Sequence, residues 1–402
     1  MSSTQVLKKL LVIAVTAGLL VGCASNQTVN TEPDSQSVSQ ASEQNSTSDL
    51  ETICNVIAYD LGESDHQSLY EKVDSDIILS RILDTFDEDS FSNQEFQKFK
   101  QRLDGLIRSK IILRSDKVRW DVVRSGVVND RYTCLVRSSL LGGGVSYVEF
   151  ELRNVDGRLR IVDWNDLVRE VRMTDMFSEL FHDIYEMADA HIMAMPYQVT
   201  TVVKQQKRYF EYLAAIRSGD PNQMLVAYDK LPLRFKNKPL YALALLNYIT
   251  DMDDPRYYKV LSNIKKRFGG TGRYDFLLID YYLLTHEYDS AKSSLDRFKK
   301  RIGEDPLLDL LLAELDNKQG NKQKFYAKCL QVMNNNPNYL DTYWYVFDQL
   351  VADGYYDDAV LVLNVLANLF EYTFYDDAFE SDVKYREFTK STAFKGWKAG
   401  SG

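Results

Sequence analysis

The sequence offers few side chains whose types and spacing could do chemistry, and one such group contains a histidine. His182 and Glu186 stand four residues apart, and Asp189 follows three residues later, so a helix would place all three on one face. Imidazole and carboxylate groups arranged in this way could hold a metal ion. A solvated helix face is the more common use of such charges, and we expect no metal here.

The four cysteines, Cys23, Cys54, Cys134 and Cys329, are the other reactive residues. They form no Cys-x-x-Cys pair and no cysteine–histidine cluster with the spacing of zinc ligands. In an oxidising compartment Cys54 and Cys134 could form a disulfide. The alternative is that both are small buried hydrophobic residues.

The middle of the chain lacks the usual partners for acid–base catalysis. His66 is the only histidine among residues 50–170, and it precedes the first helix that the spacing predicts there. Gly142-Gly143-Gly144 lies between two predicted strands and lacks the Lys-Ser/Thr that follows in a phosphate loop, so we interpret it as a hairpin turn. We therefore expect no enzyme activity and no cofactor.

Residues 1–22 have the layout of a signal peptide. Two lysines precede an apolar run, Leu10 to Leu20, which is too short to span a bilayer. The segment Leu20-Val21-Gly22-Cys23 then places a small residue directly before cysteine, and it resembles the lipobox of bacterial lipoproteins. The resemblance implies cleavage between Gly22 and Cys23, diacylglycerol on the Cys23 thiol and acylation of the new amine. The alternatives are an ordinary secretory peptide and an uncleaved anchor.

The residues after Cys23 indicate where such a lipoprotein would lie. Ala24 stands where an aspartate would favour the inner membrane, so the resemblance implies the outer membrane. Residues 23–49 are mostly small and polar, cannot bury enough apolar surface to fold, and predict a disordered tether. We expect a membrane contact through the lipid and a chain that faces the periplasm, with cell-surface exposure left open.

Residues 50–170 predict a small α+β domain. Helical spacing covers 68–86 and 92–107, and four strand-like segments follow at 117–128, 131–140, 146–154 and 159–164. The final segment, Asp156–Trp164, resembles the last hairpin of nuclear-transport-factor-like cone domains, although the third helix of that family is not apparent. The resemblance implies a curved antiparallel sheet around a pocket. Four aromatic residues could line this pocket or could simply be core: Trp120, Tyr132, Tyr147 and Trp164.

A linking helix is expected within 171–203, and residues 204–370 have a period of 34. Helix–helix turns are expected at positions separated by this period: Ser218, Met252, His286, Gly320 and Gly354. Mostly apolar residues recur nine positions later, at Ala227, Leu261, Leu295, Cys329 and Leu363. The pattern resembles the tetratricopeptide repeat, most clearly at Gly354-Tyr355-Tyr356-Asp357-Asp358-Ala359. The resemblance implies an all-α solenoid after the α+β domain. Residues 371–402 would supply a capping helix, Asp376–Trp397, and a tail.

Such arrays bind proteins or peptides in a concave groove, for which four tyrosines are candidates: Tyr241, Tyr248, Tyr282 and Tyr345. Packing between helices is their alternative role. The net charge of −10 argues against nucleic acid as a partner. We interpret the chain as a non-enzymatic scaffold that binds an envelope protein or peptide. The alternatives are a ligand-binding or enzymatic cone domain that docks through its repeats, and a structural link between outer membrane and cell wall.

Overall fold

The computed structural model describes most of the chain from Asn45 onward. The described residues are 45–63, 67–84, 101, 118–128, 131–140, 145–193, 199–249, 251, 253–270, 272–374 and 379–400. The signal peptide, the cleavage site at Gly22 and Cys23, and the tether up to residue 44 lie outside this part. So do nearly all of the predicted helix at 92–107 and the turn at 142–144. These remain predictions from the sequence.

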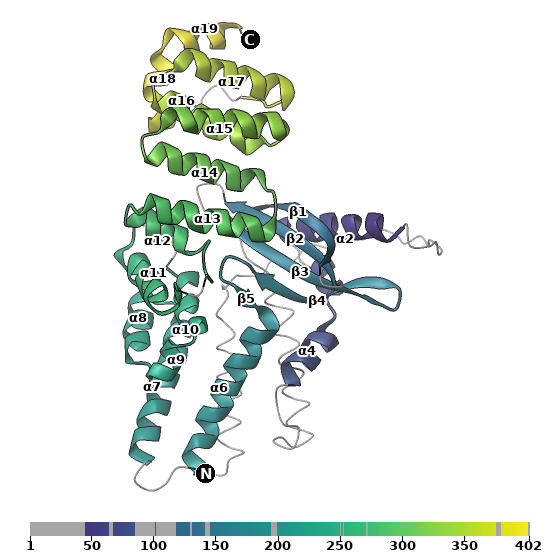
Figure 1. The fold of residues 1–402 in the computed structure, drawn as a ribbon, viewed down its shortest axis with the longest axis vertical. Helices are drawn as coiled ribbons and strands as arrows, with labels where there is room; N and C mark the ends of the chain where they lie inside the picture. The colour runs from purple at the N-terminus through teal and green to yellow at the C-terminus, as the bar shows by residue number, and fades with distance from the viewer. Residues whose placement is uncertain are drawn as a thin grey trace. The chain divides into compact units, whose positions relative to one another are not determined.

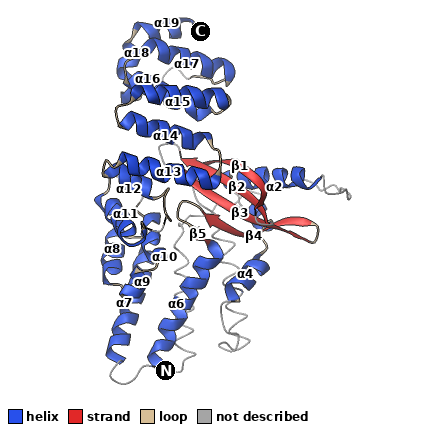
Figure 2. Cartoon of the chain, viewed as in Figure 1, coloured by secondary structure: helices blue, strands red, loops and turns tan. Residues whose placement is uncertain are grey.

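The fold class is mixed, as the sequence predicts: an antiparallel five-stranded sheet with helices is followed by a region of packed helix pairs (Figure 2). The chain divides into two compact units, Met1–Tyr281 and Tyr282–Gly402, which we describe separately. None of the helices that the structure describes is long and apolar enough to cross a membrane.

The sheet of the first unit is a meander in which each strand pairs with the next (Figure 1). Its strands are β1 (Val118–Val128), β2 (Arg131–Leu140), β3 (Val145–Val155), β4 (Arg158–Asp166) and β5 (Val171–Arg172). The four predicted strands are confirmed, whereas the two-residue β5 gave no sequence signal. Asp156 and Gly157 join β3 to β4 with φ of 51° and 79°, and two positive φ angles give the turn that suits the twist of a hairpin.

The register gives the sheet two different faces, because residues directly opposite each other in antiparallel strands point to the same side. The apolar face carries Trp120, Cys134, Val136, Val148, Phe150, Leu152 and Trp164. The charged face carries Asp121, Arg124, Thr133, Arg137, Glu149, Glu151 and Asp163, together with Leu135 and Tyr147.

In the part of the chain that the structure describes, three helices precede the sheet: α2 (Asn45–Gly62), α3 (Gln67–Glu71) and α4 (Ser75–Leu83). Residues 45–49, predicted to belong to the tether, are instead the start of α2, a helix that was not predicted. Its residues Leu50, Cys54, Ile57 and Leu61 have helical spacing and are buried. The predicted helix at 68–86 is two helices, because Lys72 and Asp74 instead exchange backbone hydrogen bonds with Ile161 of β4. A disulfide joins Cys54 of α2 to Cys134 on the apolar face, which settles the alternatives left open above.

The segment 171–203 contains the helix α6 (Met173–Met193), and helix pairs begin after it. The first unit continues with the helices α7 (Val199–Ser218), α8 (Pro221–Lys230), α9 (Leu233–Lys236), α10 (Pro239–Leu243), η3 (Ala244–Asn247) and α11 (Pro255–Phe268). Helix α12 (Leu278–Leu284) crosses into the second unit. Aspartates Asp220 and Asp254 begin α8 and α11 by accepting hydrogen bonds from free backbone N–H groups of the first turn.

The second unit continues with α13 (Tyr288–Ile302), α14 (Pro306–Lys318), α15 (Lys322–Asn335), α16 (Leu340–Ala352) and α17 (Tyr356–Leu369). The predicted period holds in the packing, because the residues nine positions after each expected turn are all buried in α8, α11, α13, α15 and α17. Tyr257 and Phe325 are also buried, at positions where the repeat family usually has a small residue.

The turns of the second unit repeat in backbone detail. His286, Gly320 and Gly354 stand 34 residues apart and all have positive φ, at 58°, 79° and 79°. In each turn the next residue donates its N–H to a carbonyl five residues back, as Tyr355 does to Leu350 at 2.9 Å. This bond closes a helix C-terminus with a left-handed residue. The period is therefore structural as well as compositional.

His286 stands where the equivalent turns have glycine, and a side chain is strained at positive φ. We expect His286→Gly to raise the free energy of unfolding of the second unit by about 0.5–1 kcal/mol. Gly320→Ala is the matched control and should lower it by about 1 kcal/mol, because the new Cβ meets open space and only the backbone is strained. Urea unfolding of both variants measures this, and equal changes of the same sign would contradict the repeat alignment.

The predicted single capping helix is wrong in form, because the described chain beyond residue 378 contains three short elements: η4 (Val383–Tyr385), α18 (Arg386–Lys390) and α19 (Thr392–Gly400). Ser391 interrupts the helix between α18 and α19 and caps the second of them with its Oγ. The predicted apolar contacts are nevertheless made. Phe379, Tyr385, Phe388 and Phe394 are buried in one cluster with Phe347 of α16.

Candidate functional site

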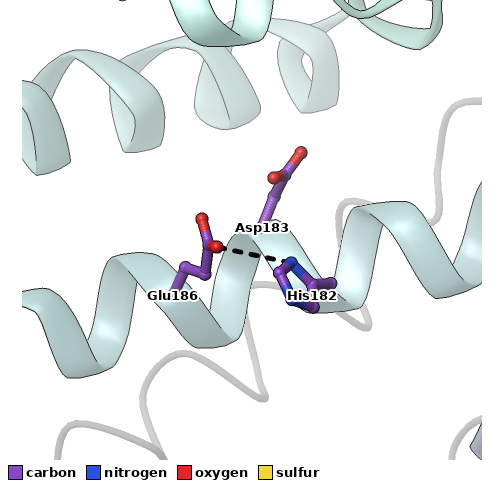
Figure 3. Close-up of side chains that lie close together, drawn as sticks. All are labelled: His182, Asp183 and Glu186. Atoms are coloured by element: carbon purple, nitrogen blue, oxygen red, sulfur yellow. Dashed lines mark ion pairs between the residues drawn. The ribbon is translucent and has the colours of Figure 1, made fainter. Parts of the chain in front are cut away.

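The histidine-containing group on α6 differs from the predicted one. Ligand atoms of His182, Asp183 and Glu186 lie within 4.8 Å of one another, whereas Asp189 lies outside the side chains that the structure describes. His182 and Glu186 are exposed neighbours on α6, with Nδ1 and Oε1 3.7 Å apart (Figure 3). Asp183 is buried and only 2 % exposed.

Protein groups already occupy the carboxylate of Asp183. Lys238 Nζ lies 2.6 Å from Oδ1, and the Tyr241 hydroxyl donates to Oδ2 at 2.5 Å. The Tyr241 oxygen also lies 3.2 Å from that of Tyr209, and both phenols are almost fully buried. Burial raises the pKa of Tyr209, so this chain of hydroxyls stays neutral. The ion pair and the hydrogen bond of Asp183 connect α6 to α10, and this structural role fits the arrangement better than an open metal site does.

The four aromatic residues predicted to line a pocket do not all lie on one face of the sheet. The register puts Trp120, Tyr132 and Trp164 on the side of the sheet that carries Cys134, and Tyr147 on the charged side. Tyr147 is fully buried, and its ring packs edge-on against the ring of Phe276, with 5.6 Å between the ring centroids. Trp120 and Trp164 are each 8 % exposed, so packing accounts for most of their surface.

The charged face instead carries a cluster of carboxylates and arginines. Glu151 of β3 is 5 % exposed and Asp163 of β4 is 1 % exposed, and they are direct cross-strand neighbours. Arg81 of α4 reaches both, with Nη2 at 2.6 Å from Glu151 and Nη1 at 3.4 Å from Asp163. Arg172 of β5 also reaches both, at 2.9 Å and 3.3 Å.

Hydrogen bonds complete this cluster. Arg131 contacts Glu151 at 3.2 Å, and the Thr174 hydroxyl donates to Asp163 at 2.7 Å. Neither carboxylate was predicted from the sequence, because their cationic partners Arg81, Arg131 and Arg172 come from three separate elements. The available signal was the alternation of Glu149, Glu151 and Arg153 along a strand whose other face is apolar.

The two buried carboxylates have pKa values shifted in opposite directions. Burial alone would raise the pKa of Glu151, but hydrogen bonds from Arg81 and Arg172 outweigh burial and hold it below the usual value. Burial raises the pKa of Asp163, and the Thr174 hydrogen bond and the Arg172 charge offset only part of that rise. Neighbouring acids with diverging pKa values are typical of functional sites and also of structural ion-pair networks.

A cavity of about 190 Å³ adjoins the cluster. Its lining includes Arg131, Thr133, Glu151, Asp163, Trp164 and Arg172. No histidine, lysine or cysteine lines it among the residues that the structure describes. The volume is below the ~300 Å³ at which pockets for drug-sized ligands begin. The site therefore offers charge and hydrogen bonds, and its described lining holds carboxylates and the Thr133 hydroxyl but no imidazole, ammonium or thiol group.

The Glu151 ion pairs predict a pH-dependent stability. We expect Glu151→Gln to lower the free energy of unfolding by about 2 kcal/mol at pH 7, because three arginines lose a shared charged acceptor. A lowered pKa stabilises the fold above the unfolded value, about 4.3, and that advantage is lost as pH falls through the folded pKa. Urea unfolding at pH 7 and near pH 3 should show the difference between wild type and variant shrinking.

Glu149→Gln is the matched control for that measurement. Glu149 is on the same strand and face, but its pair with Arg124 is at 3.1 Å between side chains that are both partly exposed. We expect a change of about 0.5 kcal/mol or less. Equal effects of the two substitutions on the free energy of unfolding would contradict the prediction that the buried ion pairs of Glu151 stabilise the fold more than the exposed pair of Glu149 does.

The four tyrosines proposed for a groove have different environments. Tyr241 and Tyr282 are buried, at 2 % and 6 % exposed, so they fit the packing alternative. Tyr248 and Tyr345 are half-buried, and the Tyr345 ring contacts Phe325 edge-on at 5.7 Å. Cys329 is also buried, and burial raises the pKa of its thiol to about 12, so it is not a reactive cysteine.

Family models, curated proteins and solved structures give no significant match to this chain. The chain is therefore characterised by its architecture, a five-stranded antiparallel sheet with helices followed by paired helices. An architecture of this kind does not by itself define a function.

Proposed function

We propose that this chain is an outer-membrane-anchored bacterial lipoprotein that binds an envelope protein or peptide without catalysing a reaction. The observation that carries the binding part is the recurrence of one helix–turn–helix unit, with left-handed turns at His286, Gly320 and Gly354. Stacked helix pairs of this kind present an extended surface to a partner. The tetratricopeptide-like identity of these pairs is part of the proposal.

The anchoring part is supported by the sequence around Cys23 and by the disulfide. The Leu20–Cys23 segment fits lipidation, and two or more acyl chains suffice for stable membrane attachment. Disulfides persist mainly in oxidising compartments outside the cytoplasm, which favours a periplasmic location for the Cys54–Cys134 bond.

A small-ligand site is the second candidate, and one observation favours it: the cavity of about 190 Å³ beside Glu151 and Asp163 is polar. Arginines already satisfy both carboxylates, so an anionic ligand would have to displace Glu151. We rank this function behind protein binding for that reason.

Cys23→Ser tests the anchor. We expect the variant to leave the membrane fraction and appear in the soluble periplasmic fraction, because the thiol that would carry diacylglycerol is gone. Immunoblotting of fractionated cells measures this, and Cys329→Ser serves as the control, since a buried thiol plays no part in anchoring. A cleaved Cys23→Ser chain that stays in the membrane fraction would contradict the proposal.

A further inference from the structure

Helix α17 is apolar on two sides. Ala359, Leu363 and Leu366 are fully buried and pack within the second unit. Leu361, Val365 and Leu369 are 62 %, 37 % and 51 % exposed. Because these three residues are four positions apart, they form one line along the outside of the helix, which we name the outer stripe.

The repeat architecture does not require this stripe. The residues one period earlier, in α15, are Ala327, Gln331 and Asn335, and those two periods earlier, in α13, are Ser293, Arg297 and Arg301. All six are exposed, and the side chains are small or polar. Packing of the helix pairs is therefore satisfied without aliphatic residues at these positions, and the outer stripe is particular to α17.

The stretch of sequence that contains the outer stripe carries only negative charge. No lysine, arginine or histidine occurs between Lys328 and Lys384. The acidic residues in that interval are Asp341, Asp348, Asp353, Asp357, Asp358, Glu371, Asp376, Asp377, Glu380 and Asp382. Several of the described ones are paired inside the unit, as Asp353 is with Lys322 and Glu380 with Lys398.

Three exposed acids at the two ends of the stripe are not paired in this way. Asp357 and Asp358 begin α17, Glu371 follows its end, and no ion pair joins them to the described part of the chain. The helix dipole favours acids at the N-terminus, which accounts in part for Asp357 and Asp358. The same dipole disfavours an acid beside the C-terminus, so it gives no reason for Glu371.

We propose that the outer stripe is the docking surface for a basic amphipathic helix of a partner protein, an inference that rests on the proposed scaffold function. The apolar side of that helix packs on Leu361, Val365 and Leu369, and its lysines and arginines pair with the acids at the two ends. In this mode of recognition the apolar sides of two helices pack together, and charge sets the choice of partner. Anionic lipid is repelled by these acids, and a second copy of the chain would bring like charges together.

The test uses the full chain and synthetic peptides. The probe is a labelled leucine–lysine amphipathic helix of about four turns, the length of α17. A leucine–glutamate peptide of the same pattern and a scrambled leucine–lysine peptide are the controls. Fluorescence anisotropy should show the leucine–lysine helix binding about tenfold or more tightly than either control.

Substitutions then locate the binding. The combined variant Leu361→Ala, Val365→Gln and Leu369→Asn carries the residues that α15 has at these positions, so it should fold normally. We expect it to weaken binding by about tenfold or more, because three side chains no longer bury apolar surface. Asp357→Asn with Glu371→Gln should weaken binding and reduce its salt dependence. Val226→Gln, at an exposed aliphatic residue of α8, is the matched control. It should change neither the affinity for the peptide nor its salt dependence.

Undiminished binding by the stripe variant, or equal binding of the basic and acidic helices, would overturn the inference. Sedimentation gives a further contrary outcome, in which the wild-type chain forms a dimer that the stripe variant loses and the occupant is a second copy. If these tests fail while the chain still crosslinks to an envelope protein in cells, the docking surface is wrong and the scaffold function stands.

Discussion

Removal of the Cys54–Cys134 disulfide is expected to lower the free energy of unfolding of the sheet by about 4 kcal/mol. The bond closes a loop with a sequence separation of 80 residues, and loops of that size give a stabilisation of this order through the unfolded chain. Both cysteines are fully buried, so the bond also fixes α2 against the apolar face. Cys54→Ala with Cys134→Ala should therefore shift unfolding of β2 and β3 to lower urea.

Hydrogen-exchange mass spectrometry in increasing urea measures this for each unit separately. A reductant should reproduce the effect in the wild-type chain and in Cys329→Ala, and it should change nothing in the double variant. The second unit should unfold at the same urea concentration throughout, because its only cysteine is the buried Cys329. Equal protection of β2 with and without reductant would contradict a structural role for the bond.

The second large effect is expected at Asp183. Asp183→Ala removes the acceptor of Lys238 and of the buried Tyr241 hydroxyl, and loss of one partner from such a buried group costs about 3 kcal/mol. Protection of α6 and α10 in hydrogen exchange should fall together, because Asp183 connects them. Tyr241→Phe should cost less, about 1 kcal/mol, since it removes one hydroxyl and leaves the Lys238 pair.

Glu186→Ala is the matched control for Asp183→Ala. Glu186 is exposed, and its contacts with His182 and Arg234 are long, at 3.7 Å and 3.5 Å. We expect a change of about 0.5 kcal/mol or less. The same pair of variants tests metal binding: zinc should leave the melting temperature of the wild-type chain unchanged. A zinc-dependent rise that both substitutions abolish would show that the trio is a metal site.

Local sequence patterns predicted the elements whose signal lies in their own residues. The strands follow from alternation of apolar and polar residues, and β2 begins and ends at the predicted Arg131 and Leu140. The helix pairs follow from the 34-residue period, because each buried position repeats in register. Helix α2 was missed because the polar composition before residue 50 suggested a tether, although Leu50, Cys54 and Ile57 carried a helical pattern.

The candidate site could not be read from the sequence in the same way. Glu151 and Arg81 are 70 residues apart in the sequence. Only the folded sheet, with α4 beside it, brings Arg81 Nη2 to 2.6 Å from Glu151 Oε1. The face of the sheet on which each aromatic residue lies was hidden for a related reason: Trp120 and Tyr147 look alike as aromatic strand residues, but the strand register puts them on opposite faces. Similarly, the spacing of possible metal ligands on α6 indicated Asp189, whereas the cluster that the structure describes contains Asp183.

The scaffold function is tested most directly by crosslinking mass spectrometry in intact cells of the native host. An amine-reactive crosslinker reports on lysines of both parts of the chain, among them Lys72 beside α3 and Lys318, Lys322 and Lys384 of the second unit. We predict crosslinks from lysines of the helix pairs to one envelope protein, and their loss when Cys23→Ser detaches the chain from the membrane. Crosslinks confined to the sheet and its flanking helices, or no partner crosslinks at all, would contradict the account.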